Sequence, residues 1–311
     1  MSVDKSFPIP VRVDEAANSA PATPWYAEPG EPLQCVKDVL LVASGKGGVG
    51  KSTVTVNLAC ALQRQGLKVG VLDADLYGPS ISRMLGTGTD LERDEQGRTL
   101  PAMGHGVYAV SVANVIPPEA ALVWKGPLVA QTLVDMFRGV AWPDLDLLLV
   151  DMPPGTGDVQ LTILEQIPVT GAVLVTTPQR LAQVDAERGI ALFHDLDIPV
   201  FGVVENMSHY VCPCCGEFQP LFPDADVAGM ADRKHVAYLG AVPLDPAGQE
   251  LADKGRPITV SSTGSPAAKA FFGLADTVVE AVERERRQSL RDADPDTRAA
   301  HEAFWERLME D

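Results

Sequence analysis

Residues 40–57 read Leu-Leu-Val-Ala-Ser-Gly-Lys-Gly-Gly-Val-Gly-Lys-Ser-Thr-Val-Thr-Val-Asn, and the rest of the chain is organised around them. The apolar run Val39–Ala43 predicts a buried parallel strand. Residues 45–52 then match the phosphate-loop pattern G-x-x-x-x-G-K-[ST], and the apolar spacing over residues 53–64 predicts a helix. Strand, glycine loop and helix in this order are the context in which the pattern binds phosphate, with a purely structural glycine turn as the alternative.

The residue types of this loop predict its chemistry. Glycine adopts backbone conformations that other residues resist, so the N–H groups of the loop can converge on phosphate oxygens at a helix N-terminus. We expect Lys51 to reach the β- and γ-phosphates of a nucleotide and the Ser52 hydroxyl to ligate Mg²⁺. The residues expected to bind the nucleotide are Gly45, Gly47, Gly48, Val49, Gly50, Lys51, Ser52 and Thr53.

Composition narrows the class of protein. The 311 residues include 42 Asp and Glu against 25 Lys and Arg, which gives a formal net charge of −17. Such an acidic chain disfavours nonspecific binding to nucleic acid or to an anionic membrane. No apolar run approaches the roughly 20 residues that cross a bilayer. The five cysteines form an odd, clustered set, which is not typical of a secreted disulfide framework, so we expect a cytoplasmic protein.

Strands and helices alternate along the chain. Further strands are predicted over residues 68–75, 107–113, 145–150, 172–176, 200–204 and 238–242, and further helices over 128–137, 181–193 and 266–287. Residues 86–104 are polar and glycine-rich and predict a surface excursion. This alternation predicts an α/β fold, a mostly parallel sheet with helices on both faces, whose ligand lies at the carboxyl ends of the strands.

Three regions of the chain are expected. Residues 1–34 are proline-rich and predict a flexible leader. Residues 35–288 contain the phosphate loop and the later cysteines in one ATPase domain. Residues 289–311 form an acidic tail in which Asp296 or Thr297 could cap a helix.

Carboxylates follow two of the predicted strands. Asp151 comes directly after the strand over 145–150, and a carboxylate there, facing a phosphate loop, is typical of a Mg²⁺ position. Asp73 and Asp75 end the strand over 68–75. If that strand runs through both, their side chains share a face; if it breaks between them, they diverge. Capping of the following turn by one of them is the alternative to a role in the site.

The third signal is the segment Cys-Pro-Cys-Cys-Gly that begins at Cys212. Cys212 and Cys215 have the C-x-x-C spacing that places two thiolates on one soft metal or cluster. Cys214 is adjacent to Cys215, so we do not expect both to ligate one centre. A cluster or a tetrahedral zinc takes four ligands, and a symmetric dimer supplies two such pairs across its axis. A redox dithiol, a zinc site and inert cysteines remain alternatives.

Two sets of residues carry a family resemblance. Lys46, ahead of the lysine of the standard pattern, makes the loop similar to the deviant Walker A motif of the MinD/ParA/nitrogenase-iron-protein superfamily. Together with residues 73–80, 124–127, 146–162 and 175–179, and with Glu-Asn-Met-Ser at 205–208 before the C-x-x-C, the chain resembles the Mrp/ApbC family over about residues 36–279. Members of that family are ATPases that carry iron–sulfur clusters.

The resemblance implies a homodimer that binds and hydrolyses ATP with Mg²⁺ and carries a 4Fe–4S cluster on Cys212 and Cys215 of both subunits. It implies that cluster-scaffold proteins donate the cluster and that apoproteins accept it. It also gives roles to other residues: Lys46 reaches the nucleotide of the partner and acts in catalysis with Lys51, Asp75 orients water, and Asp73 joins Asp151 and Ser52 in the metal shell. Asn206 and Pro243 match positions near the adenine.

Two rival functions share the nucleotide chemistry. A partitioning or positioning ATPase of the ParA/MinD type predicts a basic surface or a basic amphipathic helix, whereas residues 289–311 are acidic. That rival also gives no role to the C-x-x-C pair. A reductase similar to the nitrogenase iron protein would use one cluster at a dimer axis as well.

Overall fold

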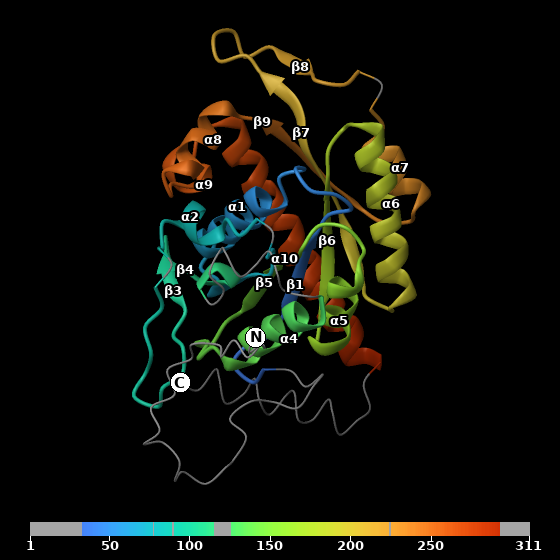
Figure 1. Cartoon of the computed structure of the whole chain (residues 1–311). Coiled ribbons are helices and arrows are strands. Elements are labelled where there is room, and N and C mark those ends of the chain that lie inside the picture. The colour runs from blue at the N-terminus through green and yellow to red at the C-terminus, as the bar shows by residue number, and fades with distance from the viewer. Residues whose placement is uncertain (1–32, 77, 89, 115–125, 224, 293–311) are drawn as a thin grey trace, which may run out of the picture.

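The computed structural model describes residues 33–76, 78–88, 90–114, 126–223 and 225–292 (Figure 1). Its strands form one sheet in the order β3-β4-β2-β5-β1-β6-β7-β8, and β9 also pairs with β7. The strands are β1 Val39–Ala43, β2 Val69–Asp73, β3 Ala102–Gly104, β4 Val107–Ser111, β5 Leu147–Asp151, β6 Gly171–Thr176, β7 Val200–Val211, β8 Phe218–Pro220 and β9 Tyr238–Leu244. All pairings are parallel except β3 with β4 and β7 with β8, so the predicted, mostly parallel sheet is confirmed.

Helices cover both faces of this sheet, as predicted (Figure 1). Along β1, Leu40 and Val42 belong to the core under α1 and α10, whereas Leu41 and Ala43 belong to the core under α4, α5 and α6. A strand whose alternate side chains are buried on opposite faces reads as a continuous apolar run. The helices are α1 Lys51–Arg64, α2 Ile81–Leu85, α4 Gly126–Gly139, α5 Asp158–Gln166, α6 Arg180–Asp195, α7 Val227–Arg233, α8 Pro246–Asp253, α9 Ile258–Ser261 and α10 Pro266–Asp292, with a 3-10 turn at Val112–Asn114.

Several boundaries differ from the predicted ones. Helix α1 begins at Lys51 instead of residue 53, and α10 runs to Asp292, past the expected end at 287 and across the boundary placed at 288. Strand β7 runs to Val211, whereas the predicted strand ended at residue 204. The prediction stopped short because the second half of the strand is only partly buried and lacks the apolar run that marks a core strand. Three parts of the predicted segments lie outside the described residues. They are residues 1–32 of the expected leader, residues 124 and 125 of the family segment, and residues 293–311 of the expected tail.

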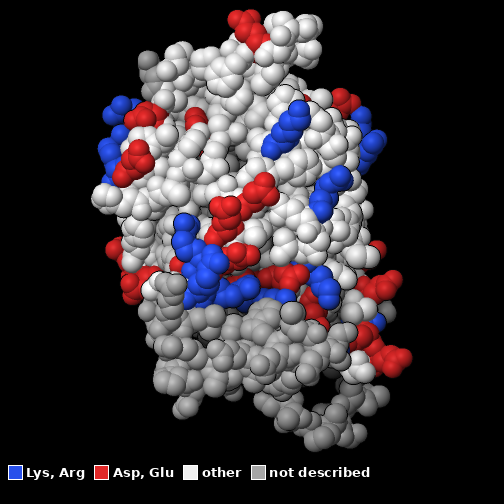
Figure 2. All heavy atoms as spheres, turned by 180° about the vertical axis from the view of Figure 1, so that it is seen from behind, with Lys and Arg blue, Asp and Glu red and all other residues white. Residues whose placement is uncertain are grey.

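The described surface carries charges of both signs. On the face in Figure 2, Lys and Arg side chains lie beside Asp and Glu in a band across the lower part of the described surface, and the area above is mostly uncharged. Within the described ranges, no helix has both the length and the apolar character needed to cross a membrane.

Candidate functional site

The carboxyl ends of β1, β2 and β5 meet at one edge of the sheet. Asp73 of β2 lies in register with Asp151 of β5, and Val42 of β1 lies in register with Asp151 from the other side. The glycine loop leaves β1 at this edge and leads into α1. The fold therefore gathers the loop and the two strand-end carboxylates, as the alternation of strands and helices predicted.

The glycine loop has the backbone geometry that glycine permits. Gly48 and Gly50 have φ of 82° and 83°, and Gly50 is the N-cap of α1. A side chain at Gly45 would collide with the backbone of Asp185 in α6, so α6 packs directly against the loop. The loop thus places N–H groups at the start of a helix, the arrangement that binds phosphate.

Lys51 lies among acidic and hydroxyl side chains and is only 5% exposed. Its Nζ is 2.8 Å from Asp151 Oδ2 and 3.5 Å from Asp75 Oδ2. The Ser52 hydroxyl donates to Asp151 Oδ2 at 2.6 Å, and the Thr55 hydroxyl donates to Asp151 Oδ1 at 2.7 Å. A hydroxyl beside a carboxylate is an oxygen donor set of the kind that Mg²⁺ prefers.

Thr55 was not singled out from the sequence. It lies four residues after Lys51, and residues with this spacing share a helix face. Its contact with Asp151 could therefore have been inferred once α1 and the position of Asp151 were both predicted.

Asp73 is fully buried, and its surroundings differ from those of Asp75. Strand β2 ends at Asp73, so the two carboxylates diverge. The Asp73 carboxylate accepts hydrogen bonds from the N–H groups of Asp75, Ser80 and Ile81 and from the Ser111 hydroxyl. Burial, and then the charge of Asp151, raises the pKa of Asp73. This geometry supports turn-capping, and a place for Asp73 in the metal shell stays a prediction.

Lys46 points to α6 within its own chain. Its Nζ lies 3.4 Å from the amide oxygen of Gln179, the N-cap residue of α6. Gln179 follows β6 at the same sheet edge, but sequence reasoning gave it no role. The reach of Lys46 to a partner's nucleotide stays a prediction.

Asn206 contacts the phosphate loop. Its Nδ2 donates to the carbonyl of Val49 at 2.9 Å in buried surroundings. Asn206 also lies in register with Val242 of β9, which places Pro243 beside this region. Adenine binding by Asn206 and Pro243 stays a prediction.

The cysteines lie in the turn of the β7–β8 hairpin, which projects beyond the rest of the sheet (Figure 1). The N–H of Cys212 donates to Glu217 O at 3.0 Å, the N–H of Gly216 donates to Cys212 O at 2.8 Å, and Gly216 has a φ of 72°. Hydrogen bonds from the N–H groups of Cys215 and Cys214 lower the pKa of the Cys212 thiol. The segment is therefore a turn, and the exclusion of Cys214 as a ligand stays a prediction.

The other two cysteines are poor ligand candidates. Cys60 is fully buried in the core under α1, and burial raises the pKa of its thiol to about 12. Burial also raises the pKa of Cys35. In the described part of the chain, no three His, Cys, Asp or Glu side chains are grouped so that they could hold a metal ion. The cysteine turn alone thus supplies an incomplete ligand set.

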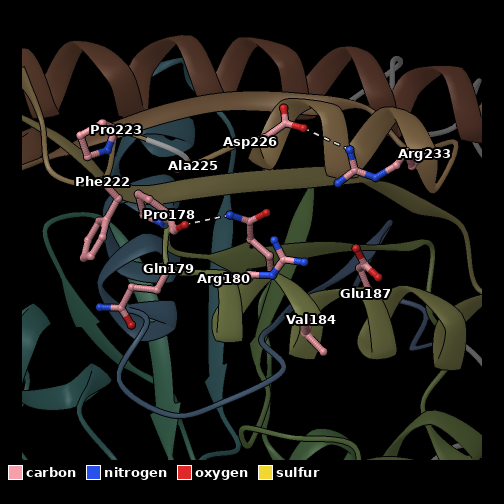
Figure 3. A pocket seen from close by; sticks show the side chains of 11 residues that line it. Pro178, Gln179, Arg180, Val184, Glu187, Phe222, Pro223, Ala225, Asp226 and Arg233 are labelled. Atoms are coloured by element: carbon pink, nitrogen blue, oxygen red, sulfur yellow. Dashed lines mark hydrogen bonds and ion pairs between the residues drawn. The ribbon is translucent and has the colours of Figure 1, made fainter.

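A separate pocket of about 510 Å³ lies between the start of α6 and the segment before α7 (Figure 3). Gln179 and Arg180 face it from the start of α6, and Phe222 and Pro223 lie over it on the opposite side (Figure 3). The pocket is lined by none of the predicted site residues.

Known proteins resemble this chain in sequence and in fold. Residues 35–279 match the model of the ParA family, which is described as NUBPL iron-transfer P-loop NTPase. The chain belongs to this family. The iron-sulfur cluster carrier protein of Escherichia coli (strain K12) is 45% identical to it over 252 residues, which cover 81% of this chain and 68% of that protein. The iron-sulfur protein required for NADH dehydrogenase, mitochondrial, of Arabidopsis thaliana is 44% identical over 255 residues, 82% of each chain.

A solved structure extends this similarity. The nucleotide-binding protein from Archaeoglobus fulgidus, in complex with ADP, superposes with a TM-score of 0.66 at 34% identity and covers 76% of this chain and 93% of that one. The predicted P-loop NTPase fold and the resemblance read from the sequence are therefore confirmed. Membership in an iron-transfer family does not favour the partitioning ATPase.

Proposed function

We propose that this P-loop NTPase binds and hydrolyses ATP and carries an iron–sulfur cluster that it transfers to apoproteins. One observation carries the proposal: an iron-transfer ATPase chain combines a complete phosphate loop with a surface turn that contains a C-x-x-C pair. A partitioning ATPase needs no such turn, and the similar proteins named as iron–sulfur carriers support its use for a cluster.

The nucleotide half of the proposal uses the edge formed by β1, β2 and β5. Lys51 contacts the phosphates, and Ser52 and Asp151 supply the oxygen ligands for Mg²⁺, which would neutralise phosphate charge when bound. Asp75, whose carboxylate lies 3.5 Å from Lys51 Nζ, orients the attacking water. Lys46 contributes from the partner subunit.

The cluster half of the proposal uses the cysteine turn. Cys212 and Cys215 supply two thiolates, and the same pair of a second subunit completes the four that a 4Fe–4S cluster takes. Since Cys214 and Cys215 are exposed, a cluster bound there is open to donor and acceptor proteins. The division into a leader, an ATPase domain and an acidic tail belongs to this proposal, with the domain boundary falling inside α10.

Anaerobic reconstitution with iron and sulfide tests the carrier function. We expect a visible absorption spectrum of a 4Fe–4S centre, matching counts of iron and sulfide, and activation of an apoprotein that needs such a cluster. A Cys212→Ala/Cys215→Ala double variant is the matched control and should show none of these. A protein that takes up zinc but never iron and sulfide would contradict the proposal, and a cluster that is reduced and reoxidised without ever leaving would favour the reductase.

A further inference from the structure

Strand β7 joins the two halves of the site. Asn206 in its middle contacts the phosphate loop, and Cys212 follows its last residue. The contacts along the intervening residues form a continuous path, which can be followed from the loop to the turn.

At the loop end, two side chains of β7 pack against the phosphate loop. Asn206 Nδ2 donates to Val49 O at 2.9 Å and lies so near Gly50 that a side chain on Gly50 would collide with it. The Met207 methyl would lie 3.4 Å from the same added atom. Gly50 is the N-cap of α1. A change in the backbone of the loop on phosphate binding would therefore alter its contacts with Asn206 and Met207.

In the middle, β7 departs from a regular strand. Met207 has a φ of 55°, which is uncommon for a residue other than glycine and persists only where its surroundings hold it. The pairing of β7 with β9 shifts register between Asn206 and Tyr210. This register shift forms a bulge in β7. The Ser208 hydroxyl stabilises the bulge, since it donates to Val242 O at 3.0 Å and lies 2.7 Å from His209 Nδ1.

At the far end, His209 supports the cysteine hairpin. Its ring centroid lies 4.1 Å from that of Phe218 in β8. Phe218 pairs with Val211, directly before the cysteine turn. A movement of His209 therefore shifts β8 and the turn that it closes.

We propose that residues 206–209 of β7 transmit the nucleotide state of the phosphate loop to the cysteine turn, with Ser208 as the positioning residue of the bulge. This regulation rests on the proposed function, since it describes how ATP controls the cluster site. The bulge, where the register of β7 with β9 shifts, is the element that the nucleotide would move in this proposal. Small shifts at such elements are amplified because packed structure is not continuously deformable.

Thiol labelling of the cluster-free, reduced, full-length chain tests this coupling. Iodoacetamide labelling is followed with Mg²⁺ and a non-hydrolysable ATP analogue, with Mg²⁺ and ADP, and without nucleotide. Trypsin cleavage after Arg188 and Arg233 releases Cys212, Cys214 and Cys215 on one fragment, and Cys35 and Cys60 lie on others as internal references. We expect the labelling rate of the hairpin fragment to differ about fivefold or more between analogue and ADP, the lower end of ordinary coupling between two sites.

Ser208→Ala removes both contacts of the bulge, so it should bring that ratio close to one while nucleotide affinity and melting temperature stay near wild type. His209→Ala, which removes the ring contact with Phe218 and also the contact with the Ser208 hydroxyl, should do the same. Thr277→Ala, which removes a hydroxyl contact inside α10, is the control and should keep the full ratio.

Two outcomes would overturn the coupling: a wild-type ratio of one, or an unchanged ratio in both Ser208→Ala and His209→Ala. An unchanged ratio in both variants would also result if the nucleotide changed labelling only by promoting a dimer that covers the cysteines. The dimer fraction is therefore measured in the same samples. Labelling needs no cluster, so the two proposals can fail separately. If the labelling rate of the cysteines depends on nucleotide but the chain never takes up iron, the carrier function is wrong and the coupling is still supported.

Discussion

Lys51 is nearly buried, and its ammonium group lies between the carboxylates of Asp151 and Asp75. Lys51→Ala should remove a charge-assisted hydrogen bond worth about 1.5–3 kcal/mol, which raises the Kd for ATP about tenfold to a hundredfold. Calorimetric titration of the purified variant measures the change, and turnover should fall as well. Lys254→Ala, at a surface lysine paired with Glu250, is the control. Wild-type hydrolysis in Lys51→Ala, with contaminating ATPase excluded, would remove this loop from the site.

Asp75 contributes at a different step. Because it is proposed to orient water and not to bind phosphate, Asp75→Asn should slow turnover about a hundredfold and leave the Kd for ATP nearly unchanged. Single-turnover hydrolysis and nucleotide titration on the same sample separate the two effects. The exposed Asp253→Asn serves as the matched control. Normal hydrolysis by Asp75→Asn would move the catalytic assignment elsewhere.

The three cysteines of the turn are predicted to behave differently. Cys212→Ala or Cys215→Ala should each abolish stable cluster binding, because C-x-x-C places its two thiolates on one centre. Cys214→Ala should keep the cluster, and all three variants should still bind nucleotide. Iron and sulfide counts after anaerobic reconstitution compare them. If Cys214→Ala loses its cluster while Cys215→Ala keeps it, the ligand pair is misassigned.

Among individual residues, the site assignments that could be predicted from the sequence are those of residues close together in the chain. The phosphate loop is a continuous motif, and Asp151 follows an unambiguous apolar strand. The contact of Lys46 with Gln179 joins residues far apart in sequence, so it needed the folded sheet edge. The contact of Thr55 with Asp151 could have been inferred from the spacing of Thr55 from Lys51. The role of Asp73 could not be chosen from sequence, because it depended on where β2 ends.

Among the elements, the short helix α2 is the one whose stability depends on whether Asp73 caps its first turn. Asp73 accepts from the N–H groups of Ser80 and Ile81 at its start and from the Ser111 hydroxyl of β4. Asp73→Ala leaves these donors without their acceptor, and each buried unsatisfied group costs about 1–3 kcal/mol, so the free energy of unfolding should fall by at least about 2 kcal/mol. Urea unfolding measures it, with Asp75→Ala for comparison. Unchanged stability together with loss of Mg²⁺-dependent ATP binding would instead support Asp73 as a metal-shell residue.

The strands that the sequence missed or cut short carry weak sequence signals. Strand β3 was missed, whereas its partner β4 was predicted. The two are joined at His105 and Gly106, which both have positive φ, as a tight hairpin requires, but His-Gly is a weaker turn signal than Asn-Gly. Strand β8 and the second half of β7 are half-buried or exposed, so no apolar run marks them. Buried central strands, by contrast, were predicted nearly residue for residue.

The central sheet is buried on both faces, and the β7–β8 hairpin with the cysteine turn projects beyond it (Figure 1). The sequence predicted the layers, because alternating strands and apolar helices leave few other arrangements. It could not predict where the turn would project, since that depends on the length of β7.

The projecting turn makes a prediction about assembly. A 4Fe–4S cluster takes four thiolates, Cys60 is buried in the core, and the described residues of one chain provide one C-x-x-C pair at the surface. The reconstituted protein should therefore be a dimer with about one cluster for two chains, and the Cys212→Ala/Cys215→Ala variant should lose the cluster-dependent dimer. Light scattering after anaerobic gel filtration, with iron counted in the same peak, measures both. A monomer that retains a full cluster would show that one chain completes the ligand set by itself, and the subunit-bridging arrangement would then have to be abandoned.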